Sequence, residues 1–363
     1  MLPLFVSLLA FSPLFTKQCS SEPLAPALYV FGDSLTDHGN NNFYSWVARA
    51  NYPPYGNNFP NGITGRFTDG KTFADITAEF LGLRFPRAYR KPARSTTGYT
   101  YASAGCGILP ETGTGLSCLS MDGQMVLLNQ TITKELVPLF ETPAQLSEYL
   151  ANSIFIVWGG SNDYLLNYFT DPNPVLNPEQ FALHLINSLS EKLTTLYELG
   201  ARKLVVLEVG PLGCLPVYRK SGNHNATWCD KEKNEMAAMF NNLLGPVVQN
   251  MASSYPDSYF TLGKLYDLTN DVFQNPANYG MTNVSHSCCI TGELLKNLPC
   301  FANLRPCEKP EEYLFWDGAH PTEASHRILA TPCFNGSGVC VPNNIEQLVQ
   351  KKITISTSLH SSA

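Results

Sequence analysis

Charged side chains are scarce in this chain of 363 residues, because Asp, Glu, Lys and Arg together make up only 15% of it. Soluble domains usually carry about a quarter. Acids outnumber bases, which gives a formal net charge of −6, and no basic patch stands out, so the chain is not expected to bind nucleic acid. A surface that is polar but poorly charged, rich in Asn, Ser, Thr and Tyr, is typical of a secreted protein.

Long apolar runs are also missing. A membrane-spanning helix takes about 20 apolar residues, and no stretch reaches that length, so stable membrane insertion is not expected. Residues 1–15 are mostly apolar and carry no side-chain charge. They predict a signal peptide over residues 1–21, followed by one domain over 22–345 and a tail over 346–363. A buried N-terminal helix is the alternative, and Pro3 and Pro13 argue against it.

The sequence offers little support for a metal or a nucleotide. No Cys-x-x-Cys pair is present, so a zinc site built from the cysteines is a poor alternative. Neither a P-loop nor a G-x-G-x-x-G segment directly follows the first apolar run, where a phosphate loop would stand. We therefore expect no metal and no cofactor.

Cysteine itself is plentiful. Of eleven cysteines, Cys19 falls in the predicted leader, which leaves an even number. In an exported chain this predicts disulfides, whose pairing the sequence leaves open. The ten are Cys106, Cys118, Cys214, Cys229, Cys288, Cys289, Cys300, Cys307, Cys333 and Cys340.

Apolar runs and helical patterns alternate along the chain. Strands are predicted at 27–31, 99–102, 153–158, 203–209 and 259–268. One helix follows Asn177, with Gln180 completing a capping box and Gly200 ending it. Others are predicted from Phe73 to the stop at Gly82 and over 231–253. Continuous apolar strands separated by helices indicate a mostly parallel sheet in a three-layer α/β/α domain, with two domains as the alternative.

The first predicted strand ends in Gly-Asp-Ser, which places Ser34 at the carboxyl end of a strand, where α/β proteins bind ligands. Ser34 could cap a helix, belong to a phosphate loop or act as a nucleophile. The phosphate-loop hypothesis lacks a glycine-rich motif directly after Ser34. The hypothesis that Ser34 is a nucleophile requires a histidine, an acid and oxyanion donors elsewhere in the chain.

Those partners follow at other strand ends. "YASAGCGIL" carries Gly105 and Gly107, and "FIVWGGSNDYL" carries Asn162. "EYLFWDGAHPTEASH" places Asp317 three residues before His320, so that one loop can present both side chains. Ser103 in "YASAG" comes near the G-x-S-x-G elbow of other hydrolases, but a tyrosine stands where the first glycine belongs.

Taken together, "FGDSLTDHGNN", "GRFTDGKTFAD", "YASAGCGI", "GGSNDY", "VGPLGCLP", "CC" and "EYLFWDGAHPTEASH" resemble the plant GDSL esterase/lipases of the SGNH hydrolase superfamily. The resemblance runs from Ala27 to about Cys340. It implies a flavodoxin-like SGNH hydrolase fold, and a location outside the cell or in the cell wall, with the vacuole as an alternative.

The resemblance also assigns roles. It implies that Ser34 is the nucleophile, His320 the general base and Asp317 the residue that orients the histidine. The oxyanion hole would use the backbone N–H of Ser34, that of Gly105 (with Gly107 as its alternative) and the side-chain amide of Asn162. One departure from the family is the histidine at position 38, for which a surface role is expected.

Further polar residues are given structural roles. Asp33 and Asp37 are expected in turns or caps, and Asp163 is expected to be structural. His184, His224, His286 and His326 are expected at the surface or satisfied in the core. Sequons predict glycosylation at Asn129, Asn225, Asn283 and Asn335.

The sequence therefore predicts a secreted serine hydrolase that cleaves acyl or acetyl esters, from small molecules, lipids or the cell wall, through an acyl-enzyme. Two rivals remain. An acyltransferase would pass the same acyl group to an alcohol, and a secreted binding glycoprotein would have lost turnover.

Overall fold

The computed structural model describes residues 22–44, 47–91, 94–218, 229–289 and 300–354. The predicted leader and the last residues of the predicted tail, 355–363, lie outside them. The strands of the main sheet are β1 (Leu28–Gly32), β2 (Arg87–Ala88), β3 (Tyr99–Thr100), β4 (Ile154–Trp158), β5 (Lys203–Leu207), β6 (Tyr259–Gly263) and β9 (Cys340–Val341). A second sheet pairs β7 (Asn283–Ser287) with β8 (Tyr313–Phe315).

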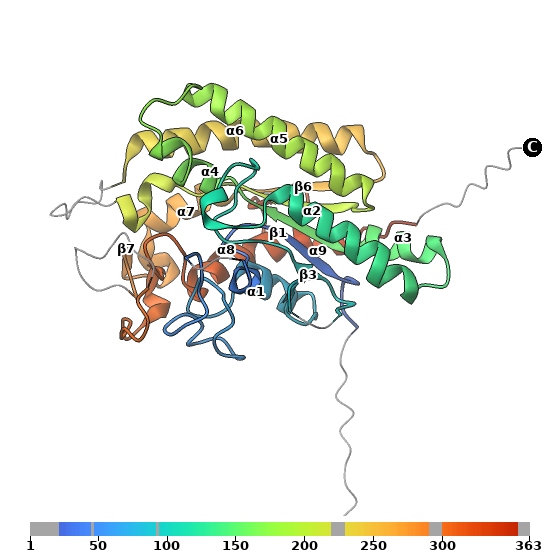
Figure 1. Ribbon diagram of the computed structural model, residues 1–363, viewed down its shortest axis with the longest axis horizontal. Coiled ribbons are helices and arrows are strands. Elements are labelled where there is room, and N and C mark those ends of the chain that lie inside the picture. The colour runs from blue at the N-terminus through green and yellow to red at the C-terminus, as the bar shows by residue number, and fades with distance from the viewer. Residues whose placement is uncertain (1–21, 45–46, 92–93, 219–228, 290–299, 355–363) are drawn as a thin grey trace, which may run out of the picture.

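Helices cover the main sheet on both faces (Figure 1). They are α1 (Phe73–Phe80), α2 (Met121–Gln130), α3 (Pro143–Asn152), α4 (Ser161–Leu165), α5 (Pro178–Glu198), α6 (Lys231–Ser254), α7 (Leu265–Gln274), α8 (Glu323–Asn335) and α9 (Ile345–Gln350). The capping box of Asn177 and Gln180 opens α5 as predicted. Among the described residues, no helix is both long enough and apolar enough to cross a bilayer.

The main sheet has the strand order β2-β3-β1-β4-β5-β6-β9, and every neighbouring pair is parallel except β6 with β9. The inner strands β3-β1-β4-β5-β6 follow the flavodoxin-like order 2-1-3-4-5. The predicted α/β/α architecture is confirmed. In this order the direction of winding reverses between β1 and β4, and ligands bind at such a point.

The two faces of the sheet build two separate cores. Tyr29 and Phe31 of β1 pack on the side of α2, α5 and α6, whereas Leu28 and Val30 pack on the side of α1, α8 and α9. Figure 1 shows α5 and α6 above the sheet and α1 and α8 below it. Alternate side chains of a strand point to opposite faces, so a continuous apolar run is what a doubly covered strand requires.

One predicted strand is too long. Residues 259–268 read as a single apolar run, but β6 ends at Gly263 and α7 begins at Leu265. From there the buried side chains Leu265 and Val272 recur seven residues apart, which is a helical spacing. Hydrophobicity alone does not separate the two elements, since both are buried.

The ten cysteines form five disulfides, which confirms the prediction that they are paired. The bonds join Cys106 to Cys118, Cys214 to Cys229, Cys288 to Cys307, Cys289 to Cys300 and Cys333 to Cys340. Cys288 and Cys289 follow β7 and lie beside the segment after β8. The disulfides therefore tie down the segment that leads into Asp317.

Candidate active site

Three neighbouring strands end at one edge of the sheet and bring the predicted site residues together. Ser34 follows β1, Gly105 follows β3 and Asn162 lies in the first turn of α4 after β4. Because β3, β1 and β4 are adjacent and parallel, these residues meet at the reversal point of the sheet. All three line one cavity.

Gly32 makes the sharp end of β1 possible. Its φ is +151°, and an added Cβ would lie 2.0 Å from the carbonyl oxygen of Trp158. Gln124 seals this strand end, because its side-chain oxygen accepts from Gly32 N and its amide donates to Gly32 O. The chain can therefore turn abruptly and expose Ser34, as only glycine fits so close to β4.

The polar run after Ser34 is a buried scaffold. Asp37 accepts backbone N–H groups from Gly39, Asn40, Asn41 and Ala104. The side chain of Asn41 bonds both the N–H and the carbonyl of Ala104. Since Ala104 directly precedes Gly105, these bonds fix the backbone of the expected oxyanion donor. The turn role expected for Asp37 agrees with this arrangement.

A loop between β8 and α8 presents Asp317 and His320 to Ser34. Nε2 of His320 lies 2.8 Å from Oγ of Ser34, and Nδ1 lies 2.7 Å from Oδ2 of Asp317. An ionised carboxylate can only accept, so Nδ1 carries the proton and Nε2 of the neutral ring is left to accept from the serine hydroxyl. The side chain of His320 is 18% exposed and that of Asp317 only 2%.

Asp317 and His320 each favour the charged form of the other. Burial alone would raise the pKa of Asp317, but His320 and hydrogen bonds from Tyr55 and the Ala319 N–H hold it below its usual value. Burial disfavours protonation of His320, yet Asp317 raises the pKa of the imidazole above its ordinary value. The pair therefore stabilises an imidazolium at the position where a proton from Ser34 would arrive.

Asp33 lies beside the serine and is buried. One carboxylate oxygen accepts from Leu35 N, the turn contact expected for it. Its other oxygen, Oδ2, has no hydrogen-bond partner among the described residues. Burial raises the pKa of Asp33 to about 7, against the lowering effects of the Leu35 N–H and His320.

The glycines follow β3 and Asn162 follows β4, the two strands that flank β1. The Asn162 amide donates one hydrogen to the carbonyl of Cys106, 2.9 Å away, which orients the group. Gly105 lines the cavity. Gly107 instead packs against Asp163, because an added Cβ would lie 2.3 Å from that carboxylate. Asp163 accepts from Ile108 N, Leu109 N and Thr112 Oγ1, in keeping with a structural role.

Ser103 is fully buried and its hydroxyl is already used. Its Oγ donates to Oδ1 of Asn41 and accepts from Leu119 N. No histidine is among these partners. Ser103 therefore serves to close the loop around the glycine segment.

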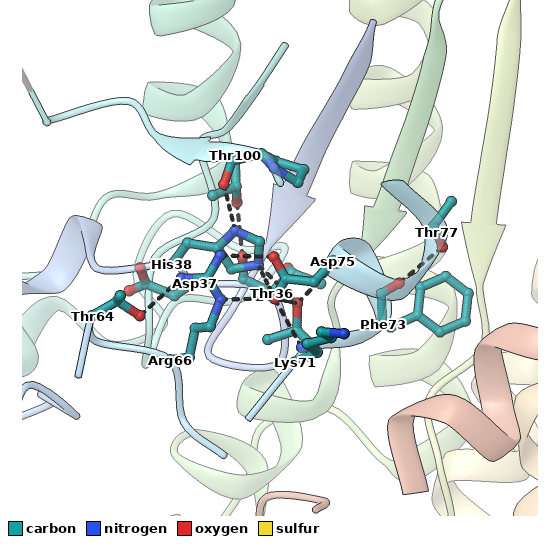
Figure 2. Close-up of polar contacts among 12 residues, drawn as sticks. Thr36, Asp37, His38, Thr64, Arg66, Lys71, Phe73, Asp75, Thr77 and Thr100 are labelled. Atoms are coloured by element: carbon teal, nitrogen blue, oxygen red, sulfur yellow. Dashed lines mark hydrogen bonds and ion pairs between the residues drawn. The ribbon is translucent and has the colours of Figure 1, made fainter. Parts of the chain in front are cut away.

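The expected surface role of His38 is wrong. His38 is 1% exposed, and its ring nitrogens bond the carbonyl of Pro86 and the hydroxyl of Thr72. Figure 2 shows it beside Asp75, which Arg66 holds in a two-pronged ion pair with both bonds at 2.7 Å. Burial, together with Arg66, lowers the pKa of His38 to about 4. The neutral ring thus pins the loop after Ser34 to the start of α1.

The remaining histidines and the sequon asparagines differ in their exposure to solvent. His184 and His286 are exposed, whereas His326 is in the core and its Nδ1 has no partner among the described residues, so it is not the satisfied core histidine expected. Asn129 and Asn335 are exposed and Asn283 is half-buried. His224 and Asn225 lie outside the described residues.

The cavity at Ser34 has a volume of about 410 Å³ and a mainly aliphatic lining. Its open end carries Val47, 74% exposed, and Leu166, 43% exposed. We call the part lined mainly by buried side chains its enclosed end, and this part lies between α7 and α8. The lining side chains there are Leu265, Thr269 and Val272 from α7, Leu314 and Phe315 from β8, and Ser325, Ile328 and Leu329 from α8.

Two residues at the site carry no motif that marks them in the sequence. Tyr55 donates a hydrogen bond to Asp317 at 2.6 Å. Phe67 packs on the imidazole of His320, with 4.9 Å between ring centres. Both come from the segment between β1 and α1, more than 250 residues before the loop they support, so no local pattern links them to it.

Two solved structures from Streptomyces show a weak similarity to this chain. Phospholipase A1 from Streptomyces albidoflavus has a TM-score of 0.37 at 14% identity, over 85% of this chain and 97% of that one. An extracellular lipase from Streptomyces rimosus has a TM-score of 0.36 at 12% identity, with the same two coverages.

Sequence relatives are much closer. GDSL esterase/lipase 7 of Arabidopsis thaliana is 39% identical over 327 residues, which cover 87% of this chain and 89% of that protein. A second Arabidopsis thaliana GDSL esterase/lipase is 36% identical over 340 residues, or 91% of this chain and 93% of that protein. The sequence model of the GDSL-like Lipase/Acylhydrolase family matches residues 28–332. The chain therefore belongs to the GDSL-like lipase/acylhydrolase family and is a carboxylic ester hydrolase.

Proposed function

We propose that this protein is a secreted serine esterase that cleaves acyl esters through an acyl-enzyme on Ser34, with His320 as general base and Asp317 as the residue that orients it. The observation that carries the proposal is the unbroken set of contacts from Ser34 Oγ to His320 Nε2, and from His320 Nδ1 to Asp317, at 2.8 and 2.7 Å. Serine alone is a weak nucleophile and needs such a base.

The chemistry balances with these groups. Ser34 Oγ bonds to the ester carbonyl carbon as its proton moves to His320 Nε2. The bond between that carbon and the alcohol oxygen then breaks, and the imidazolium gives its proton to the departing alcohol. A water molecule repeats both steps on the acyl-serine, which releases the carboxylic acid and restores Ser34.

The negative oxygen formed in each attack needs donors. We assign this role to the backbone N–H of Ser34, the backbone N–H of Gly105 and the side-chain amide of Asn162. The position of all three on the lining of one cavity supports the assignment. The contact of Gly107 with Asp163 favours Gly105 over Gly107 as the backbone donor.

We assign the acyl chain to the enclosed end of the cavity. Both hydroxyl groups there are occupied within the protein, since Thr269 Oγ1 donates to Leu265 O and Ser325 Oγ donates to Leu314 O. A chain of methylene groups fits such a lining better than a polar group, which would lose its hydrogen bonds. The cavity volume lies in the range of about 300–1,000 Å³ that is usual for small-molecule sites.

We also propose that residues 1–21 direct export, with glycans on Asn129 and Asn335, and that the domain extends past residue 345 to include α9, whose Ile345 and Leu348 are buried in the core. Five disulfides and a poorly charged surface support an oxidising destination. N-terminal sequencing of protein from a eukaryotic secretion host should give a start after the leader. An intact leader on the exported protein would refute its removal.

A chain-length series tests the acyl assignment. For p-nitrophenyl acetate, butyrate, hexanoate and octanoate, kcat/KM should rise roughly fourfold per methylene, from about 0.8 kcal/mol for each one buried, until the enclosed end is filled. Thr269→Phe should lower kcat/KM for octanoate and spare acetate, whereas the equal-sized Thr269→Val should leave the profile unchanged. An unchanged profile in Thr269→Phe would place the acyl chain elsewhere.

A further inference from the structure

The hydroxyl of Tyr55 contacts the carboxylate of Asp317 directly. Oη of Tyr55 lies 2.6 Å from Oδ2 of Asp317, the same oxygen that lies 2.7 Å from Nδ1 of His320. The other oxygen, Oδ1, lies 2.8 Å from the same Nδ1 and accepts the backbone N–H groups of Ala319 and His320. Tyr55 is thus the side chain that shares Oδ2 with the histidine.

The direction of this hydrogen bond is fixed by the surroundings. Tyr55 is fully buried, and the N–H of Cys300 donates to its Oη at 3.3 Å. The tyrosine proton must therefore point at Asp317. Burial, and the negative charge of Asp317, raise the pKa of Tyr55 well above its usual value, so it stays a neutral donor at every pH at which an esterase works.

A rigid frame holds the tyrosine in place. Tyr55 belongs to a small core with Phe67, Trp316 and the cysteines of the Cys289–Cys300 disulfide. Tyr52 packs edge-on against it, with ring centres 5.4 Å apart, and donates its own hydroxyl to the carbonyl of Cys300. The hydroxyl of Tyr55 therefore cannot swing away from Asp317 without disturbing this core.

We propose that Tyr55 is a positioning residue of the triad: by donating to Oδ2 it fixes the carboxylate plane and limits how strongly Asp317 holds the proton on His320. The proposal rests on the proposed function of Ser34, His320 and Asp317. A carboxylate that accepts an extra hydrogen bond is a weaker base. Without the Tyr55 donor, Asp317 would stabilise the imidazolium more, and the base would stay protonated to higher pH.

Other charged groups face the same histidine and stay in place when Tyr55 is changed. Asp33 raises the affinity of His320 for a proton, and Asp163 acts on Asp33 in turn. His326 interacts with His320 from α8. Tyr52 lies near Asp317 but bonds Cys300. Since none of these contacts involves the Tyr55 hydroxyl, a shift on its removal would belong to Tyr55.

The test compares Tyr55→Phe with Tyr52→Phe as a matched control that loses one tyrosine hydroxyl from the same core. In Tyr55→Phe the acid limb of the kcat/KM profile should move toward higher pH by about 0.5 to 1 unit, roughly half of the shift that loss of one hydrogen bond to a charged group gives, because Tyr55 acts on His320 only through Asp317. In Tyr52→Phe the limb should stay where it is in the wild type. A lower rate with an unmoved limb in Tyr55→Phe would overturn the proposal, and so would equal shifts in both variants.

A second substitution should shift the acid limb in the opposite direction, and it is less disruptive to the fold. Placing 3-fluorotyrosine at position 55 keeps the shape and makes the hydroxyl a stronger donor, so the acid limb should move toward lower pH. Labelling of the wild type by a fluorophosphonate separates the two proposals. If Ser34 is not labelled, the proposed function fails. If Ser34 is labelled but the acid limb stays unmoved both in Tyr55→Phe and in the 3-fluorotyrosine protein, only the role of Tyr55 fails.

Discussion

Replacing Asn162 with alanine removes one proposed oxyanion donor and leaves the nucleophile and base in place. The Asn162 amide has two hydrogens, and one of them is held by the carbonyl of Cys106 at 2.9 Å. The other has no acceptor among the residues that the structure describes, and we expect it to meet the ester oxygen that becomes negative beside Ser34. Because that charge exists only in the transition state, the substitution should lower kcat and leave KM nearly unchanged.

The size of the effect follows from the burial of the group. Asn162 is 8% exposed, so its amide acts in a poorly hydrated cavity, and loss of one such donor costs about 100- to 1,000-fold in kcat, or roughly 3–4 kcal/mol. Removing the amide also leaves Cys106 O without this donor. Some loss of thermal stability is therefore expected as well, and it should not depend on substrate.

The assay is steady-state hydrolysis of a p-nitrophenyl ester by the wild type, Asn162→Ala and the control Asn167→Ala. Asn167 lies just beyond α4 and outside the cavity lining, and its side-chain amide donates to Thr112 Oγ1 at 3.4 Å. The control should keep wild-type kcat. A rise in KM with unchanged kcat in Asn162→Ala would refute the oxyanion role and assign this residue to ground-state binding.

Other predictions follow from the same contacts. Ser34→Ala and His320→Ala should each abolish nearly all turnover, and the double variant should be no slower than either single one, since residues that act as a unit are not additive; a further loss in the double variant would contradict a shared step. Asp317→Asn should stay folded by circular dichroism and lower kcat by up to about 10⁴-fold, and near-normal turnover would show that another group holds the ring. Activity of the wild type should rise with pH through a midpoint above about 6.5, the ordinary histidine value, because the pKa of His320 is raised; a midpoint below that value would contradict the raised pKa. His38 has a pKa of about 4 in the folded protein and about 6.5 in the unfolded chain, so the unfolded chain binds the proton first as pH falls. Between pH 7 and about pH 5, the wild type should therefore lose roughly 2 kcal/mol more unfolding free energy than His38→Gln in urea titrations. Equal losses in the two proteins would show that His38 does not stay neutral.

Much of the fold and of the candidate site could be predicted from the sequence because the signals are local. The apolar run ending in Gly-Asp-Ser marks both the end of β1 and the position of Ser34. Asp317 and His320 are three residues apart, so a single loop presents both. Asn162 follows a pair of glycines at the end of β4.

The rest depends on contacts between distant segments, which leave no local pattern. His38 was misplaced because its partners Pro86 and Thr72 lie in other segments. Tyr55 meets Asp317 across 262 positions. The enclosed end of the cavity lies where α7 and α8 come together. The apolar pattern instead predicts one strand over 259–268, which includes the start of α7. Disulfide pairing is likewise set by the folded arrangement.

The central claim is that Ser34 is the nucleophile, and covalent labelling tests it most directly. The secreted protein is treated with a fluorophosphonate at neutral pH, digested and mapped by mass spectrometry, with Ser34→Ala as the control. The account predicts one adduct, on Ser34, with loss of activity in proportion to labelling and no adduct in the control. Labelling of Ser103, or a Ser34→Ala protein with wild-type rates, would contradict it.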